Sequence, residues 1–271
     1  MRVALVTNNH VPPREGIGRH VIELAKRLPS LGIEPLVVAK GQGLRAWQRL
    51  EVEGVPTALY PYVPIRPFHQ EAIRAVLQPW LDQGADGVDL LHLHLPLLPR
   101  LRTSLPRLVT FHSPMLSDTE AIVEGGLRST LIKANAKLFS QAYEHSHIAA
   151  ASQLIAVSRN VKDELAARYR LGRHEPLVIE NGVDSDRLTS RPGPVAAPRA
   201  LYVGRLGYRK GLGRLLEAVA VSRRPDLQLE LAGEGPLRGM LKRRALALGI
   251  ADRVHFLGFL DQQQLCAAHH R

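Results

Sequence analysis

The chain has 271 residues and a formal net charge of +11, with 36 Lys and Arg against 25 Asp and Glu. A content of 45% hydrophobic and 23% charged residues is typical of globular proteins and excludes a disordered or collagen-like chain. The single cysteine excludes an intrachain disulfide framework and predicts a cytoplasmic protein, while the excess of positive charge predicts an anionic partner.

Apolar segments with strand character alternate with amphipathic helical segments up to about residue 183. Residues 2–7 form a short apolar run, whereas residues 17–31 place apolar side chains at helical spacing. This alternation predicts a parallel α/β sheet that is covered by helices on both faces. In chain order we expect strands at residues 2–7, 33–39, 88–94, 107–111, 153–157 and 177–179, and helices at residues 17–31, 69–81, 119–151 and 161–169.

The pattern restarts after a segment rich in proline and small residues, as linkers often are. We expect an α/β domain over residues 1–183, a linker over residues 184–198, and part of a second α/β domain over residues 199–271. The second domain offers three strand segments, which is few for a doubly wound sheet. Its expected strands are residues 200–203, 227–231 and 254–257, and its expected helices are residues 212–222, 237–248 and a last one from residue 261.

The first candidate binding loop lies between the first strand and the first helix. Doubly wound sheets bind ligands at the carboxyl ends of their strands, where the N–H groups of the next helix favour phosphate. Gly16 and Gly18 flank Ile17 there, but the third glycine of the GxGxxG motif is not present. The loop fits either a close approach of a ligand to the backbone or a plain turn.

A second loop, over residues 203–211, combines glycines with two cations. Gly204 opens it, and Arg205 and Lys210 can reach one bound phosphate from its two ends. Arginine offers a planar fork of donors and lysine a compact point charge. A solvated basic turn is the alternative, and a P-loop is excluded because the sequence GxxxxGK[ST] does not occur.

Two further loops carry isolated polar residues. Glu234 lies between two glycines and is followed by Pro236, a pattern that also fits a helix cap. His112 follows an expected strand, a position that suits either a structural or a functional histidine.

Two other patterns suggest metal ligands. His92 and His94 lie on one face of an expected strand, but no third ligand is evident, so a structural role is favoured. Asp184 and Asp186 match an Asp-x-Asp metal signature, yet they lie in a turn before the linker and are interpreted as solvated.

Taken together, these segments resemble the retaining glycosyltransferases of family 4, which have the two-domain GT-B fold. The segment EGIGRHVIELAKRL is similar to the family's Gly-Gly-x-x-Arg-His pattern, with Glu15 in place of the first glycine. The segments LLHLHLP, LVTFHS, IAVSRNVKDEL and VIENGVDSDRL follow in the family's order. The strongest similarity is LYVGRLGYRKGLGRLLEAVA, followed by LELAGEGPLRGMLKRRALALGIADRVHFLGFL.

The resemblance implies transfer of a sugar, with retention, from a nucleotide-diphosphate sugar to a lipid-linked, saccharide or small-molecule acceptor. Arg205 and Lys210 would hold the diphosphate and stabilise the charge of the leaving nucleotide, so that no metal is required. His112 would face the transferred sugar. The donor-binding residues that the resemblance implies are Gly16, Ile17, Gly18, Gly204, Glu234 and Gly258.

The family's Glu-x₇-Glu segment, expected after the last helix, does not occur before Arg271. We therefore expect a truncated family member with impaired catalysis. The alternative is a non-catalytic nucleotide-sugar or lipid-binding remnant, or one subunit of a split enzyme.

Arginines outside the candidate loops are consistent with a second anionic partner. An aromatic content of 5% and the absence of a recognition motif argue against nucleic acid. The arginine clusters fit either a peripheral contact with an anionic membrane surface or a solvated basic surface. These clusters are Arg100, Arg102 and Arg107, and Arg45 with Arg49 in an amphipathic stretch.

Overall fold

The computed structural model describes residues 1–13, 16–63, 68–120, 130, 134, 139–183, 198–207 and 210–269. The described chain divides into two compact units, the first up to Asn181 and the second from Gly182 on. Glu15, Asp184, Asp186 and nearly all of the expected linker lie outside the described residues.

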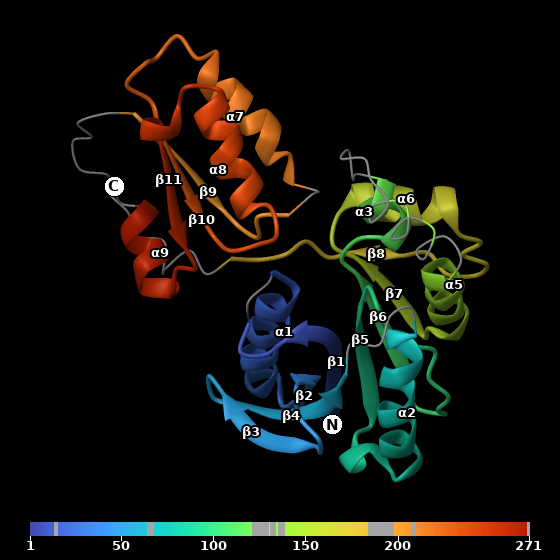
Figure 1. The fold of residues 1–271 in the computed structure, drawn as a ribbon. Coiled ribbons are helices and arrows are strands. Elements are labelled where there is room, and N and C mark those ends of the chain that lie inside the picture. The colour runs from blue at the N-terminus through green and yellow to red at the C-terminus, as the bar shows by residue number, and fades with distance from the viewer. Residues whose placement is uncertain are drawn as a thin grey trace. The chain divides into compact units, whose positions relative to one another are not determined.

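A single sheet organises the first unit (Figure 1). Within the described ranges it has eight strands in the order β3-β4-β2-β1-β5-β6-β7-β8. Neighbouring strands are parallel except for β3 and β4, which form an antiparallel hairpin at one edge. The strands are β1 (Arg2–His10), β2 (Glu34–Gln42), β3 (Gln48–Val52), β4 (Val55–Tyr62), β5 (Leu90–Leu95), β6 (Arg107–Phe111), β7 (Gln153–Ala156) and β8 (Leu177–Val178).

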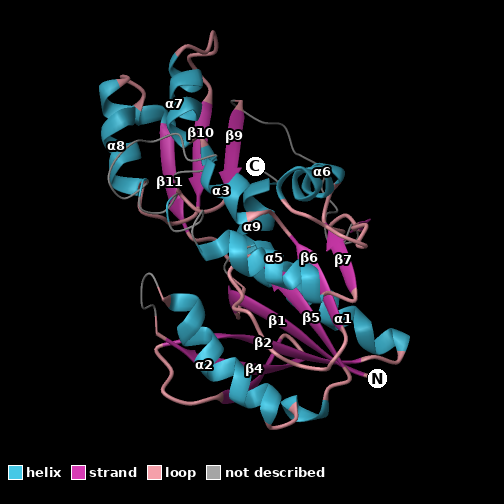
Figure 2. Ribbon diagram, turned by 90° about the vertical axis from the view of Figure 1, so that its right-hand side faces the viewer, coloured by secondary structure: helices cyan, strands magenta, loops and turns pink. Residues whose placement is uncertain are grey.

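Helices cover both faces of this sheet, because alternate strand residues point to opposite sides. Val3 and Leu5 of β1 pack with the apolar face of α1, whereas Ala4 and Val6 pack into the larger cluster with α2 and α5. Figure 2 shows α2 and α5 on one side of the strands. The helices are α1 (Gly16–Arg27), α2 (His69–Asp82), α3 (Met115–Glu120), α5 (Gln141–Ala150) and α6 (Arg159–Arg168), with the short 3₁₀ helix η1 (Leu28–Leu31) after α1.

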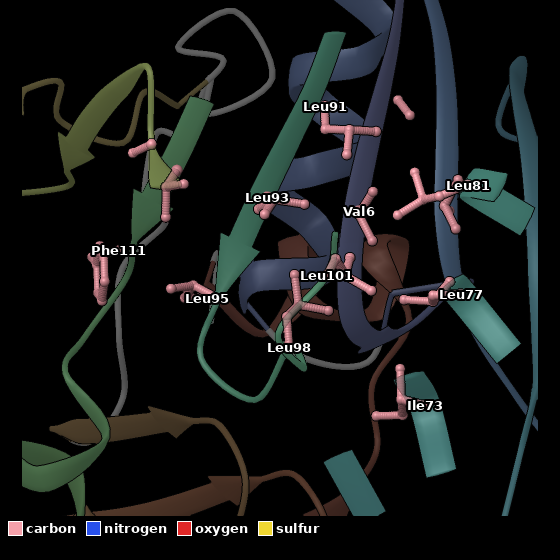
Figure 3. Packing of buried hydrophobic residues seen from close by; sticks show 14 of the residues in the cluster. Val6, Ile73, Leu77, Leu81, Leu91, Leu93, Leu95, Leu98, Leu101 and Phe111 are labelled. Atoms are coloured by element: carbon pink, nitrogen blue, oxygen red, sulfur yellow. The ribbon is translucent and has the colours of Figure 1, made fainter. Parts of the chain in front are cut away.

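The leucines of β5 show this alternation clearly. Leu91, Leu93 and Leu95 are fully buried in the larger cluster, where they lie near Val6 and Leu98 (Figure 3). The residues between them, His92 and His94, therefore face the α1 side of the sheet.

The second unit has a smaller sheet. Its described part contains three parallel strands in the order β11-β10-β9. Leu229 and Leu231 pack against helices on one face, and on the other face Glu230 is paired with Arg199 at 3.0 Å. The elements are β9 (Arg199–Val203), α7 (Leu212–Ala220), β10 (Gln228–Ala232), α8 (Arg238–Ala247), β11 (Val254–Gly258) and α9 (Gln262–His269).

The α/β class with parallel strands in each unit is confirmed, and β6 has the predicted bounds of residues 107–111. The strand predicted at residues 2–7 continues to His10. The predicted helix over residues 119–151 begins earlier, at Met115, and α5 ends at Ala150 because the next residue is extended (φ −70°, ψ 141°). Most residues between α3 and α5 lie outside the described ranges, so the continuity of that helix stays a prediction.

The β3–β4 hairpin corrects the interpretation of the stretch around Arg45 and Arg49. Arg49 belongs to β3, and its guanidinium lies 2.6 Å from an Asp86 carboxylate oxygen. The charge of Arg49 is therefore paired with that of Asp86 within the fold. The hairpin turn consists of Glu53 and Gly54, both with positive φ (52° and 81°), as a tight two-residue turn requires.

Candidate functional site

Backbone hydrogen bonds join the loops at the carboxyl ends of β9, β10 and β11. The Gly204 N–H donates to the Ala232 carbonyl at 2.9 Å, and the Gly233 N–H donates to the Gly258 carbonyl at 2.6 Å. A Cβ placed on Gly258 would lie 3.2 Å from Glu234 Oε1. The structure thus brings together Gly204, Glu234 and Gly258, which the sequence placed in three separate loops.

Glycine is required in these loops because the chain approaches itself closely. A Cβ on Gly233 would lie 2.0 Å from the Gly204 carbonyl oxygen, and Gly233 itself has a φ of 141°. A Cβ on Gly235 would lie 2.3 Å from the Leu206 carbonyl oxygen. The glycines therefore allow the backbones of these loops to pack directly on one another in a glycine-built layer. A helix cap alone would not require such close packing.

Two exposed cations, Arg205 and Lys210, lie between β9 and α7. Arg205 accepts a hydrogen bond at its carbonyl oxygen from the Tyr202 hydroxyl at 3.0 Å, which fixes the start of the loop. The Lys210 N–H donates to the Gly207 carbonyl at 3.2 Å. Arg205 and Lys210 are therefore presented to solvent from one short loop, a suitable position for contacting an anion.

Glu234 is the acidic member of this loop layer. Its carboxylate lies 3.2 Å from the Arg238 guanidinium, one turn further along the chain, and both side chains are partly exposed. The exposed carboxylate oxygens of Glu234 can also accept hydrogen bonds from hydroxyl groups.

In the first unit, Gly16, Ile17 and Gly18 form the first turn of α1, and no acidic side chain lies in that turn. A Cβ on Gly18 would lie 2.8 Å from the His10 carbonyl oxygen, so Gly18 is needed for α1 to approach the end of β1. A Cβ on Gly16 meets no described atom within 4 Å. Gly18 thus has a packing role, while Gly16 lies open at the positive end of the helix dipole.

His112, immediately after β6, belongs to a group of four histidines. Its Nε2 lies 3.2 Å from Nδ1 of His94, and its ring centroid is 4.9 Å from that of His20 on α1. The ring of His92 lies 4.2 Å from that of His94, and its Nε2 is 2.8 Å from the Thr110 hydroxyl. The strand pair β5–β6 and helix α1 thus bring together imidazoles from three chain segments.

Burial makes these imidazoles uncharged at neutral pH. Burial, with a smaller effect from the neighbouring histidines, lowers the pKa of His112 to about 3 and that of His92 to about 4. The pKa of the fully buried His94 is also well below its ordinary value, and burial lowers that of His20. Neutral rings can donate one hydrogen bond, accept another, or ligate a metal.

Sequence reasoning found His92, His94 and His112 but missed their association with His20. The available signal was topological, because β1 pairs with β5 and leads directly into α1. A helix that packs over β5 places its first-turn residues near the end of that strand.

Arg100, Arg102 and Arg107 line one pocket together with His145 and Ser146. Two guanidinium nitrogens of Arg107 donate to backbone carbonyls within the same region, at 3.2 and 2.8 Å. The three arginines are therefore brought together, with Arg107 held in a fixed orientation. Among the helices that the structure describes, none has the length and apolarity needed to cross a membrane.

Comparisons with known proteins agree with this architecture. The chain is 27% identical, over 92% of its length, to the D-inositol 3-phosphate glycosyltransferase of Streptomyces avermitilis, and it spans 60% of the length of that relative.

Two solved structures share the fold. Sucrose-phosphate synthase from Thermosynechococcus elongatus matches with a TM-score of 0.79 at 20% identity, over 100% of this chain and 73% of that one. Anabaena HepE in complex with UDP and glucose matches with a TM-score of 0.64 at 18% identity, over 96% of this chain and 70% of that one. These likenesses confirm the GT-B type of fold.

Two family descriptions together cover almost the whole sequence. "Glycosyl transferases group 1" matches residues 192–271. "Glycosyltransferase Family 4" matches residues 14–187, more than half of the chain, and the protein therefore belongs to glycosyltransferase family 4.

Proposed function

We propose that the protein transfers a sugar from a nucleotide-diphosphate sugar to a lipid-linked, saccharide or small-molecule acceptor, with retention of anomeric configuration. The observation that carries the proposal is the glycine-built layer at the ends of β9, β10 and β11, from which Arg205 and Lys210 emerge. Membership of the family supports it, as does the binding of UDP and glucose by HepE.

The proposed role of the two cations is electrostatic. Negative charge develops on the diphosphate as the sugar departs, and positive groups already in place stabilise that charge without reorganisation. Arg205 can grip two phosphate oxygens at once, while Lys210 supplies a point charge at the other end of the loop. The transfer then needs no metal ion at the diphosphate, and Gly204 leaves room for the phosphate against the backbone.

The remaining assignments follow the chemistry of each group. Glu234 accepts hydrogen bonds from the nucleotide, with Gly258 lying beside it. In the first unit, the amides of Gly16, Ile17 and Gly18 begin α1 and attract the β-phosphate. His112, uncharged because of its burial, exchanges hydrogen bonds with the transferred sugar.

Calorimetry and turnover assays with UDP-, GDP- and ADP-glucose test this proposal. We expect one of the three nucleotides to bind, and product to form with the anomeric configuration of the donor, as judged by NMR. Binding without turnover would instead support the non-catalytic nucleotide-sugar binding role. A chain that binds none of the three nucleotides contradicts both functions.

We also propose that the protein works at the cytoplasmic face of an anionic membrane. The arginine-lined pocket around Arg100, Arg102 and Arg107 supports this location. Co-sedimentation with vesicles of phosphatidylcholine, with and without phosphatidylglycerol, tests it. We expect binding only to the anionic vesicles and its loss in the double variant Arg100→Glu/Arg102→Glu, whereas equal binding to both vesicle types contradicts the proposal.

A further inference from the structure

The histidine group on the α1 side of β5 and β6 has a geometry that hydrogen bonding to a sugar does not require. One ring nitrogen each of His20, His94 and His112 lies within 4.8 Å of the other two. Three imidazoles thus converge from a helix, a strand and a strand end, close enough to share one ligand. Each ring is held by a different element: His20 by α1, His94 by β5 and His112 by the segment directly after β6.

The distances suit a tetrahedral metal ion. Zinc–nitrogen bonds of about 2.0–2.1 Å place two ligand nitrogens of a tetrahedral site roughly 3.3 Å apart. Nδ1 of His94 and Nε2 of His112 are already 3.2 Å apart. Because His20 and His112 are only partly buried, small side-chain rotations can close the remaining distances.

The second nitrogen of the His94 ring lies outside the proposed metal contacts. Among the residues that the structure describes, none is a hydrogen-bond partner of His94 Nε2, although this atom is buried. Because the proposed ligand atom of this ring is Nδ1, Nε2 does not contact the ion and is left for a separate hydrogen bond. His92 is not counted as a ligand because its Nε2 contacts the Thr110 hydroxyl, and its ring supports that of His94.

We propose that His20, His94 and His112 bind one divalent transition-metal ion, of which Zn²⁺ is the representative. Imidazole ligands suit zinc, copper, iron and nickel and do not suit magnesium or calcium. Three protein ligands leave the fourth position of the ion open to water or to an oxygen of another molecule.

Binding of this ion would regulate the proposed transfer reaction. An ion held by His112 removes that ring from the transferred sugar, so Zn²⁺ inhibits transfer. This regulatory consequence rests on the proposed function, whereas metal binding itself does not. The site differs from the diphosphate contact, for which the proposed reaction uses Arg205 and Lys210.

Metal binding is measured on the full chain after removal of metals with EDTA and in the absence of any nucleotide. Calorimetry with Zn²⁺ and visible absorption with Co²⁺ should give one ion per chain. The variants His20→Ala and His112→Ala should each weaken binding by at least about 100-fold, since loss of a supporting partner alone costs 10- to 100-fold. Unchanged tryptophan fluorescence shows that these variants are folded.

The sequence supplies a matched control, because His269 and His270 are adjacent and can also bind metal. The double variant His269→Ala/His270→Ala should retain the full affinity. Loss of binding in this control, or its retention in His20→Ala and His112→Ala, overturns the proposal, as does a folded chain that binds no Zn²⁺. Failure of the transfer assay with an intact metal titration would overturn only the proposed function.

Discussion

The two units build the carboxyl ends of their strands in opposite ways. In the first unit, β5 and β6 end in buried, uncharged imidazoles that reach one another through their side chains. In the second, β9, β10 and β11 end in glycines whose backbones touch, and the charged side chains are exposed. The first site should therefore be sensitive to protonation and to metal ions. The second should be sensitive to substitution of its glycines and should bind phosphate.

The two units can be followed separately by spectroscopy. The chain has two tryptophans: Trp80 belongs to the large core cluster of the first unit, and the partly buried Trp47 packs against that cluster. Tryptophan fluorescence therefore reports the unfolding of the first unit, whereas far-UV circular dichroism reports both.

The largest effect should come from Gly233→Ala. The new Cβ would lie 2.0 Å from the Gly204 carbonyl oxygen, so the loops after β9 and β10 must separate. We expect a loss on the order of 4 kcal/mol from the free energy of unfolding of the second unit, the range of severe single substitutions. In urea, circular dichroism should show an early transition that tryptophan fluorescence does not. Coincident, unshifted transitions would contradict the close approach.

Acid should destabilise the first unit through His147. This ring is buried and donates from Nε2 to the Leu98 carbonyl at 3.2 Å, and burial lowers its pKa to about 4. In the unfolded chain His147 takes up a proton as the pH falls below about 6.5, whereas in the folded chain it does so only near pH 4. The free energy of unfolding therefore decreases as the pH falls through that window. The full contribution is on the order of 3 kcal/mol.

The measurement is urea unfolding followed by tryptophan fluorescence at several pH values in this window. His147→Gln, which keeps a donor but cannot be protonated, should make the pH dependence shallower by the share of His147, while the buried His92, His94 and His112 keep theirs. An equally steep pH dependence in the variant would assign the effect to other groups.

A smaller effect is expected for nucleotide binding by Arg205→Ala. Loss of a charge-assisted hydrogen bond weakens binding by about 1.5–3 kcal/mol, or roughly 10- to 100-fold. Arg224→Ala is the matched control, because Arg224 is paired with Asp226 at the opposite end of β10. Calorimetry with the nucleotide that binds the wild-type chain measures the affinity of both variants. An affinity of Arg205→Ala equal to that of the wild type would show that Arg205 does not contact the nucleotide.

The smallest expected effect is a gain in stability from Gly213→Ala. Gly213 lies in α7, and its Cβ would meet no described atom within 4 Å. The substitution should stabilise the second unit by about 0.5 kcal/mol because it restricts the unfolded chain. Circular dichroism in urea measures this gain, and a loss would show that the glycines of this unit are needed beyond the strand ends.

The sequence predicted elements with strong periodicity and missed those that depend on distant neighbours. The strand over residues 107–111 was predicted with its observed bounds because its apolar run is followed by a clear break. The β3–β4 hairpin was missed because its outer strand is polar and its Glu53-Gly54 turn is a weak signal. His20 was missed because its proximity to His94 exists only after β1 and β5 have paired.

The central position of β1 has a consequence for how the protein is made. Arg2–His10 pairs with β2 on one side and with β5, which begins at Leu90, on the other. During synthesis β1 must therefore wait for some eighty further residues before its second neighbour exists, and such distant pairings slow folding. In the second unit each strand pairs with the next in sequence, so that β9, β10 and β11 can assemble in the order of their synthesis.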